Sequence, residues 1–194
     1  ALRRPLVIEN LAAVLPGRRF VAARRRGKFL LLDLDPPGTL LCHLGMSGRL
    51  TLDAVSAPLL PHTHAVLRLE DGRELRFVDP RRFGLLDWLE PGAETADPSL
   101  ARLGPEPLDP EIGRWLPPRL KARRAPLKAL LLDQHLVAGV GNIYAAEALW
   151  RAGVRPDREG RRTALPRLAR LAHEVRSVLE EAAAEGGTPI PSSG

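Results

Sequence analysis

The sequence of 194 residues predicts an α+β protein, in which an antiparallel β-sandwich domain is followed by a helical domain. Before Pro105, apolar residues alternate mostly with polar ones, which is typical of half-buried strands. Beyond Pro118 they recur at helical spacing. A proline-rich stretch separates the two patterns. We therefore expect a β-sandwich domain at residues 1–108, a helical domain at 109–187 and a tail at 188–194.

The first half reads as strands joined by turns. Residues 28–35 (KFLLLDLD), 39–43 (TLLCH) and 49–52 have a period of mostly two and are predicted to be strands, separated by Pro-Pro-Gly and glycine-rich breaks. Residues 64–70 and 73–78 flank Asp71-Gly72, a pair that tolerates positive φ and favours a two-residue hairpin turn. These signals predict an antiparallel β unit.

The second half reads as helices. Two short helical patterns within residues 133–151 meet at a Gly-Val-Gly-Asn turn, where Asn142 is expected to cap the second helix. A helix N-terminus preceded by glycines leaves backbone N–H groups free and carries partial positive charge, so it suits an anion such as phosphate. The last helix ends at Gly186-Gly187. Its apolar face comprises Leu168, Leu171, Val175, Val178, Leu179 and Ala182.

The charge distribution is compatible with a nucleic-acid partner without proving one. Lysine and arginine outnumber the acids 29 to 23, and 44% of the residues are hydrophobic, which is ample for a core. Residues 17–28 hold six basic groups and no acid, and residues 119–128 hold five and none. Such clusters are as consistent with solvated surface as with nucleic-acid binding.

Cysteine content and hydropathy exclude several classes. A single cysteine, Cys42, excludes an intramolecular disulfide and a cysteine-based zinc cluster within these residues, and its apolar surroundings predict a buried core thiol. No apolar segment reaches membrane-spanning length, and no signal-peptide pattern opens the sequence. We expect a cytoplasmic setting.

Five motifs in order carry a resemblance to a known family. They are RRRGKFLLL, HLGMSG, DPRRFG, LGPEPL and LLDQHLVAGVGNIYAAEALWRAGVRP, between Leu2 and Gly187. Together they resemble formamidopyrimidine-DNA glycosylase, of the helix-two-turn-helix DNA glycosylases. The resemblance implies a β-sandwich joined to a helix-two-turn-helix domain, with DNA held between them.

The resemblance also implies an activity. It is excision of oxidised purines, namely 8-oxoguanine and formamidopyrimidines, from duplex DNA by base flipping and Schiff-base AP lyase chemistry. The implied partner is double-stranded DNA containing such lesions. A monomer without a membrane partner, associated with the nucleoid in a bacterial cytoplasm, is expected.

Base eversion leaves a gap in the stack that the protein must fill. Met46 supplies an adaptable thioether on a glycine-flanked turn, and Arg81 and Phe83 lie on another loop. The resemblance assigns all three to the gap, with Arg81 facing the cytosine opposite the lesion. Taken alone, Met46 also suits a core position. Arg81 and Arg82 also suit a surface salt-bridged pair beside Asp79.

Four further residues are implied as DNA contacts: His62, Arg123, Lys128 and Asn142. A lysine on the first helix and an amide at the start of the second are suited to clamp a single phosphate. His62 is otherwise an ordinary solvated loop histidine.

Two residues are implied in catalysis. The resemblance assigns Lys28 the proton donation during β-elimination and puts Glu147 beside the active site. A surface cation for Lys28 and a helical salt bridge for Glu147 are the alternatives.

The sequence also departs from the family. The family nucleophile is an N-terminal proline followed by glutamate, whereas this sequence opens with Ala1-Leu2 in what resembles a later part of the fold. The family continues into a four-cysteine zinc finger, so Zn²⁺ is expected in intact members and no metal or other cofactor in this chain. We expect the β-sandwich to be incomplete at its N-terminus and the printed chain to be inactive as a lyase. The alternative is a non-catalytic damaged-DNA-binding protein on the same scaffold.

Overall fold

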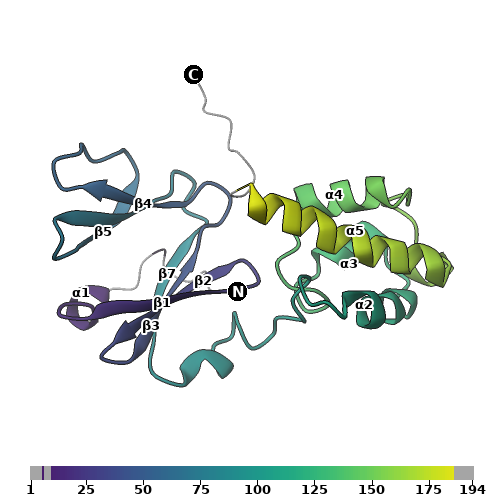
Figure 1. The fold of residues 1–194 in the computed structure, drawn as a ribbon, viewed down its shortest axis with the longest axis horizontal. Coiled ribbons are helices and arrows are strands. Elements are labelled where there is room, and N and C mark those ends of the chain that lie inside the picture. The colour runs from purple at the N-terminus through teal and green to yellow at the C-terminus, as the bar shows by residue number, and fades with distance from the viewer. Residues whose placement is uncertain (1–5, 7–9, 186–194) are drawn as a thin grey trace. The chain divides into compact units, whose positions relative to one another are not determined.

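The computed structural model describes Leu6 and residues 10–185. The chain divides into two compact units, Ala1–Ala101 and Arg102–Gly194. Sequence patterning put the boundary at residue 108, within the loop that follows the first unit. Strands occupy the first unit and helices the second (Figure 1), so the predicted α+β class is confirmed. No helix in the described part of the chain is long and apolar enough to cross a membrane.

In the N-terminal unit, the described residues form two antiparallel sheets. One has the strand order β1-β2-β3-β7 and the other β4-β6-β5. The short helices α1 and η1 precede and follow the strands. The bounds are α1 Leu11–Val14, β1 Arg19–Arg26, β2 Phe29–Asp35, β3 Gly38–His43, β4 Arg49–Ala54, β5 Thr63–Arg68, β6 Arg73–Val78, β7 Leu85–Leu89 and η1 Ala93–Thr95.

The sequence anticipated β2 to β6 and missed β1 and β7. β1 (RFVAARRR) is rich in arginine, and most of the strand is exposed. It therefore lacks the alternation of apolar and polar residues that indicates a strand. β7 (LLDWL) is a short, mostly buried apolar run at the edge of its sheet, and periodicity cannot separate strand from helix in such a run. Both pair through backbone hydrogen bonds that depend on tertiary context.

The β5–β6 hairpin is confirmed, but its predicted two-residue turn is wrong. Leu69 N–H donates to the carbonyl of Arg73, and Gly72 N–H donates to the carbonyl of Leu69. Gly72 has φ 79°, whereas Asp71 does not adopt positive φ. This is a three-residue loop with a left-handed glycine, which adds a bulge beside the turn.

The core of this unit lies between the sheets. Phe77 and Trp88 pack with leucines from β2, β3 and β7. Cys42 is fully buried there, as predicted, and burial raises the pKa of its thiol to about 12. The thiolate needed for reactivity is therefore scarce at neutral pH.

In the second unit, residues 102–185 form four α-helices around one apolar core. They are α2 Ile112–Lys121, α3 Leu127–Leu132, α4 Asn142–Arg151 and α5 Leu165–Ala184, with the 3₁₀ turn η2 at Gly160–Arg162. The long helix α5 packs against α2 and α4 (Figure 1) and buries the predicted face at Leu168, Leu171 and Val175. Helix α2 contains Pro117 and Pro118, so the proline-rich stretch that reads as a break is partly helical. The predicted helix end at Gly186-Gly187 lies outside the described residues.

Candidate nucleic-acid interface

The Met46 turn joins β3 to β4. Gly48 N–H donates to the carbonyl of Leu44 at 2.8 Å, and Gly45 adopts φ 65°, which favours glycine. The turn holds Met46 away from the core, and the residue is 69% exposed to solvent. The alternative of a core gap-filler is therefore wrong, since a large apolar side chain stands in solvent at the tip of a turn.

A second loop, residues 79–84 between β6 and β7, carries the other predicted gap-filling residues. The Arg81 guanidinium carbon lies 5.1 Å from the centre of the Phe83 ring, a cation–π arrangement. Phe83 is 45% exposed. Arg82 adopts φ 56°, unusual for a residue with a side chain. The loop therefore presents an aromatic plate and a guanidinium together.

Asp79 is fully buried and joins the two loops. Its carboxylate accepts hydrogen bonds from the Ser47 hydroxyl and from Gly84 N–H, both at 2.7 Å. Burial by itself opposes ionisation, but these hydrogen bonds outweigh it and lower the pKa of Asp79. Among the described residues, neither Arg81 nor Arg82 forms a salt bridge with Asp79, so that alternative is wrong.

The same aspartate also fixes the histidine segment. Asp79 N–H donates to the carbonyl of His62 at 3.0 Å, and the Asp79 carbonyl lies 2.9 Å from Nε2 of His64. His62 adopts φ 66° and is exposed. Hydrogen bonds to Asp79 thus bring together the three segments that carry Met46, His62, and Arg81 with Phe83, although these segments are distant in sequence.

Lys28 lies in the β1–β2 turn and not at the start of a strand, where the sequence put it. Gly27 takes φ 57°, and Arg26 pairs with Phe29 across the turn. Partial burial of the ammonium lowers the pKa of Lys28, which eases release of a proton.

His43 is a candidate that sequence reasoning missed. Burial, and then the charge of Lys28, lower its pKa, so the neutral imidazole is favoured at neutral pH. Gly45 N–H donates to its Nδ1 at 3.0 Å, which assigns the ring proton to Nε2. The ring also packs on Phe29, 4.8 Å between centroids. The available signal was its place in the HLGMSG motif, two residues before the turn.

In the helical unit, the side chain of Gln134 holds the turn between α3 and α4. Its Nε2 donates to the carbonyls of Leu132 and Val140, each at 3.0 Å, and its Oε1 accepts Gly139 N–H at 2.9 Å. One amide therefore closes the loop leading into α4. Sequence reasoning missed this role.

The predicted cap of α4 is wrong in detail. Gly141 occupies the N-cap position, and Asn142 is the first helical residue without a side-chain capping bond. The exposed Asn142 amide therefore remains near a helix N-terminus whose first backbone N–H groups point outward. Gly141 in an extended conformation starts the helix without a side-chain cap.

The remaining predicted residues have ordinary surroundings. Arg123 is exposed after α2, and Lys128 lies half-buried on α3, where no ion pair within the described ranges engages its ammonium. Glu147 accepts a 2.8 Å hydrogen bond from Arg151, one turn later on α4. This is the helical salt bridge weighed as the alternative, and a role for Glu147 in catalysis stays a prediction.

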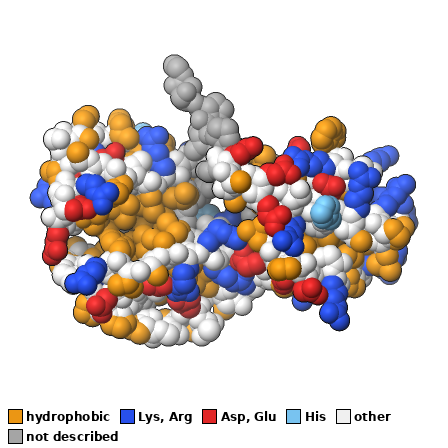
Figure 2. Space-filling view, in the orientation of Figure 1, with side chains coloured by type: hydrophobic (Ala, Val, Ile, Leu, Met, Phe, Trp, Pro, Cys, Tyr) orange, Lys and Arg blue, Asp and Glu red, His pale blue; other side chains and the backbone are white. Residues whose placement is uncertain are grey.

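The surface of the helical unit is rich in cations. Figure 2 shows Lys and Arg side chains gathered where α5 begins. Exposed arginines there include Arg158, Arg161, Arg162, Arg167 and Arg170. Arg161 is neutralised by Glu159, and Arg155 by Asp157, so part of this positive surface is internally paired.

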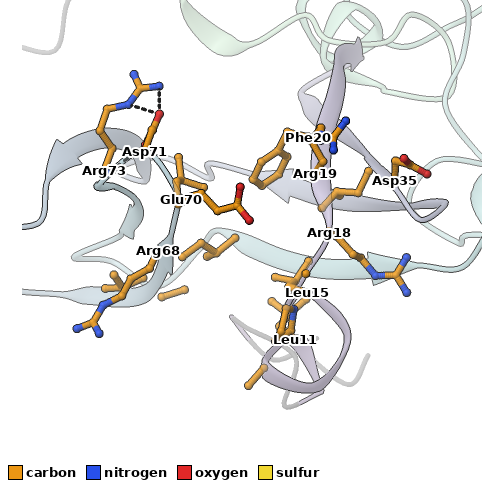
Figure 3. Close-up of a pocket in the computed structure, with 18 of the residues that line it drawn as sticks. Leu11, Leu15, Arg18, Arg19, Phe20, Asp35, Arg68, Glu70, Asp71 and Arg73 are labelled. Carbon is orange, nitrogen blue, oxygen red and sulfur yellow. Dashed lines mark hydrogen bonds and ion pairs between the residues drawn. The ribbon is translucent and has the colours of Figure 1, made fainter.

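A pocket of about 1220 Å³ in the N-terminal unit is separate from these loops. Leu11 and Leu15 come from or follow α1, Phe20 comes from β1, and Glu70 lies across from Phe20 at the β5–β6 turn (Figure 3). Figure 2 shows hydrophobic side chains gathered on the visible face of this unit. None of the predicted site residues lines the pocket.

The fold and these surfaces define a helix-two-turn-helix DNA-repair protein. Two family models match it: the formamidopyrimidine-DNA glycosylase N-terminal domain at residues 1–86 and the formamidopyrimidine-DNA glycosylase H2TH domain at 103–193. The chain belongs to the formamidopyrimidine-DNA glycosylase family, as its motifs predict.

Relatives and solved structures agree. The chain is 50% identical to formamidopyrimidine-DNA glycosylase of Acidithiobacillus ferrooxidans, over 97% of this chain and 69% of that protein. It resembles the crystal structure of the MutM (Fpg) protein of Thermus thermophilus, with a TM-score of 0.83 and 44% sequence identity. That match covers 96% of this chain and 70% of the Thermus thermophilus chain. It also resembles Lactococcus lactis Fpg in complex with abasic-site DNA, with TM-score 0.87, 28% identity, 95% of this chain and 68% of that one.

Proposed function

We propose that this chain forms the DNA-binding body of a base-excision glycosylase and AP lyase that removes oxidised purines from duplex DNA. The observation that carries the proposal is the pair of interlocked loops presenting exposed Met46 beside Arg81 and Phe83. Large apolar side chains held at loop tips in solvent are suited to enter a base stack. A DNA complex of the related Lactococcus lactis protein supports the choice of partner.

Each surface then has a task. With the damaged nucleotide everted, Met46 and Phe83 fill the vacated stack, and Arg81 donates to the base left without a partner. The N-terminus of α4, with Lys128, Arg123 and the Asn142 amide, holds backbone phosphate, as His62 does from the N-terminal unit. Phosphate contacts position the duplex, whereas Arg81 reads the opposite base.

The chemical step needs an amine nucleophile and a proton donor. The resemblance implies that a proline amine attacks C1′ of the sugar and that the base leaves, which gives a Schiff base. The Schiff base acidifies a C2′ proton, and loss of that proton expels the 3′ phosphate. Lys28 supplies the proton donor in this scheme, and its lowered pKa favours that role. Glu147 is the second, active-site-adjacent residue.

None of the described residues is assigned to a zinc site. Within the described ranges, no cluster of three or more His, Cys, Asp or Glu side chains is arranged to hold a metal ion. Cys42 is buried in the β core. These residues do not fit a zinc site, and we assign no step to one.

Binding and trapping assays with the 194-residue chain test the proposal. We expect it to bind a duplex containing 8-oxoguanine opposite cytosine more tightly than an undamaged duplex. We expect a polypeptide that begins at Ala1 to give no covalent adduct with borohydride, because Schiff-base formation needs a nucleophilic amine and that polypeptide carries no N-terminal proline amine. Equal affinity for damaged and undamaged DNA would refute the proposed lesion recognition. A trapped adduct would show that another amine, such as Lys28, replaces proline.

A non-catalytic damage-binding protein is the second candidate. It is favoured by the same loops, because exposed Met46 and Phe83 can enter a base stack without any chemical step. The genomic sequence upstream of the codon for Ala1 separates the two. An in-frame Met-Pro-Glu supports the enzyme, and a stop codon supports the binding protein.

A further inference from the structure

We propose that Ser47 and Asp79 act as a positioning pair that fixes the Met46 turn against the 79–84 loop, so that both loops enter a duplex as one unit. The proposal rests on the function proposed above for these loops. It adds two residues that touch no DNA but determine how well Arg81 reads the opposite base.

The pair spans both ends of the 79–84 loop. The Ser47 hydroxyl donates to Oδ1 of Asp79 at 2.7 Å and accepts Arg81 N–H at 3.2 Å. Oδ2 of Asp79 accepts Gly84 N–H at 2.7 Å. The Ser47–Asp79 contact and its hydrogen bonds therefore hold the 79–84 loop at three points. These are its first residue Asp79, the backbone of Arg81 and its last residue Gly84.

The backbones of the Met46 turn and of the 79–84 loop approach each other closely. A Cβ added to Gly45 would lie 2.6 Å from the carbonyl carbon of Phe83, and one added to Gly84 would lie 2.6 Å from the Phe77 ring. Contacts this short are forbidden to real side chains, so both glycines mark a close approach. At Gly45 the Met46 turn therefore lies directly against the backbone of the 79–84 loop.

Burial explains why the contact is strong enough to matter. Asp79 has 0% of its surface exposed, and its carboxylate oxygens are occupied by local donors. A buried carboxylate that loses a donor is strongly destabilised. The loop geometry is thereby set before DNA arrives, which reduces the ordering cost of binding.

The consequence concerns specificity. Arg81 stacks over Phe83 at 5.1 Å and needs a defined origin to reach a base edge. If Ser47 is removed, Arg81 keeps its charge, so attraction to phosphate persists while directional base readout weakens. A merely structural role for Ser47 would weaken binding to all duplexes alike.

The test uses the 194-residue chain and two readouts. The first is amide hydrogen exchange of residues 79–84 without DNA. The second is the ratio of dissociation constants for a tetrahydrofuran abasic-site duplex with adenine opposite and with cytosine opposite. Ser47→Ala removes both hydrogen bonds, and Ser47→Thr retains the hydroxyl. Ser177→Ala is the matched control, because it removes a 2.9 Å hydroxyl–carboxylate bond on α5.

For Ser47→Ala we expect exchange of the loop to rise about tenfold and the adenine-to-cytosine ratio to fall about fivefold, as the loss of hydrogen bonds of ordinary strength implies. Ser47→Thr and Ser177→Ala should match the wild type in both. Asp79→Asn, which keeps the shape of the side chain, should reproduce the exchange result if Ser47→Ala does not fold. Unchanged loop exchange would overturn the proposed coupling.

A double-mutant cycle separates positioning from independent contact. If Ser47 acts through Arg81, the Ser47→Ala/Arg81→Ala protein should discriminate no worse than Arg81→Ala alone. Effects that multiply would overturn the proposal. If the wild-type chain shows no cytosine preference, the proposed role of Arg81 fails, and the exchange result still decides whether Ser47 and Asp79 couple the loops.

Discussion

Single residues of the N-terminal unit divide into buried groups that fix backbone and exposed groups that are available to a ligand. Asp79 belongs to the first kind, with its carboxylate bonds made to its own surroundings. Met46 and Phe83 belong to the second. Arg81 and Arg82 are adjacent and chemically identical, yet only Arg81 stacks on Phe83, whereas Arg82 takes the left-handed backbone conformation.

Replacing Arg81 with alanine is expected to reduce opposite-base preference. Arg81→Ala should lower the preference for cytosine over adenine opposite an abasic site by about 1–3 kcal/mol, because the bidentate donor is lost. Competition binding with the two duplexes measures it. Arg114→Ala, an exposed cation on α2, is the control. An unchanged preference would remove Arg81 from base readout.

The ionised carboxylate of Asp79 is expected to make the free energy of unfolding depend on pH. Its folded pKa lies below the ordinary 3.8, so its ionised form contributes stability above that pH, and the contribution is lost as pH falls through the folded pKa. Asp79→Asn should cost about 1–3 kcal/mol at pH 7, since one buried donor loses its acceptor. Urea unfolding should show this difference shrinking below about pH 4. A difference that is constant down to about pH 3 would contradict the assignment.

Loops and turns, more than helices and strands, carry the candidate site at the scale of elements. The Met46 turn joins strands of different sheets, β3 and β4, and the 79–84 loop returns the chain from β6 to β7. In the helical unit, Gln134 closes the turn between α3 and α4. In each case a rigid frame holds a short irregular segment at its surface.

Gly45 is expected to be less tolerant of a side chain than Gly17. Both adopt positive φ, 65° and 77°, so alanine carries the same backbone cost at each. Only at Gly45 does an added Cβ meet another backbone, since nothing lies within 4 Å of it at Gly17. Gly45→Ala should therefore destabilise the chain more and speed exchange of residues 79–84. Equal effects in thermal unfolding and exchange would show that the loops are not in close contact.

Gln134 is expected to support the phosphate-binding turn. Gln134→Ala removes three hydrogen bonds and should lower the free energy of unfolding by about 1–3 kcal/mol while weakening duplex binding. His135→Ala is the neighbouring control, because that exposed ring pairs with Asp133 through Nδ1 at 3.1 Å and does not hold the turn. Urea unfolding and fluorescence anisotropy measure the two effects. Full binding by Gln134→Ala would show that the turn needs no such support.

For the whole molecule, we expect electrostatics to determine the general affinity for duplex DNA and the loops to determine selectivity. The formal net charge is +6, and cations are distributed over both units. Association with duplex DNA should weaken steeply with salt, because phosphate contacts release counterions. Many surface arginines are already paired with acids, so the net charge alone overstates the number of contacts.

Lys128 is expected to contribute one phosphate contact. Lys128→Ala should weaken binding to damaged and undamaged duplexes alike and reduce the slope of log K against log salt by about one. Titrations at several salt concentrations measure the slope. Arg114→Ala should leave it unchanged, since that arginine is paired with Glu111. A loss confined to damaged DNA would mean that Lys128 reads the lesion and does not bind backbone.

Local sequence patterns were sufficient to predict the α+β class, the antiparallel β5–β6 hairpin, the burial of Cys42 and the family. These depend on periodicity, turn chemistry and ordered motifs, all of which lie in contiguous residues. Tertiary contacts were needed to establish that Met46 is exposed, that Gly141 rather than Asn142 occupies the N-cap of α4, and that β1 and β7 are strands. It also brought His43 beside Lys28 and Ser47 onto Asp79. Such contacts join residues far apart in the chain, and hydrogen bonding and burial at those positions leave no periodic signal.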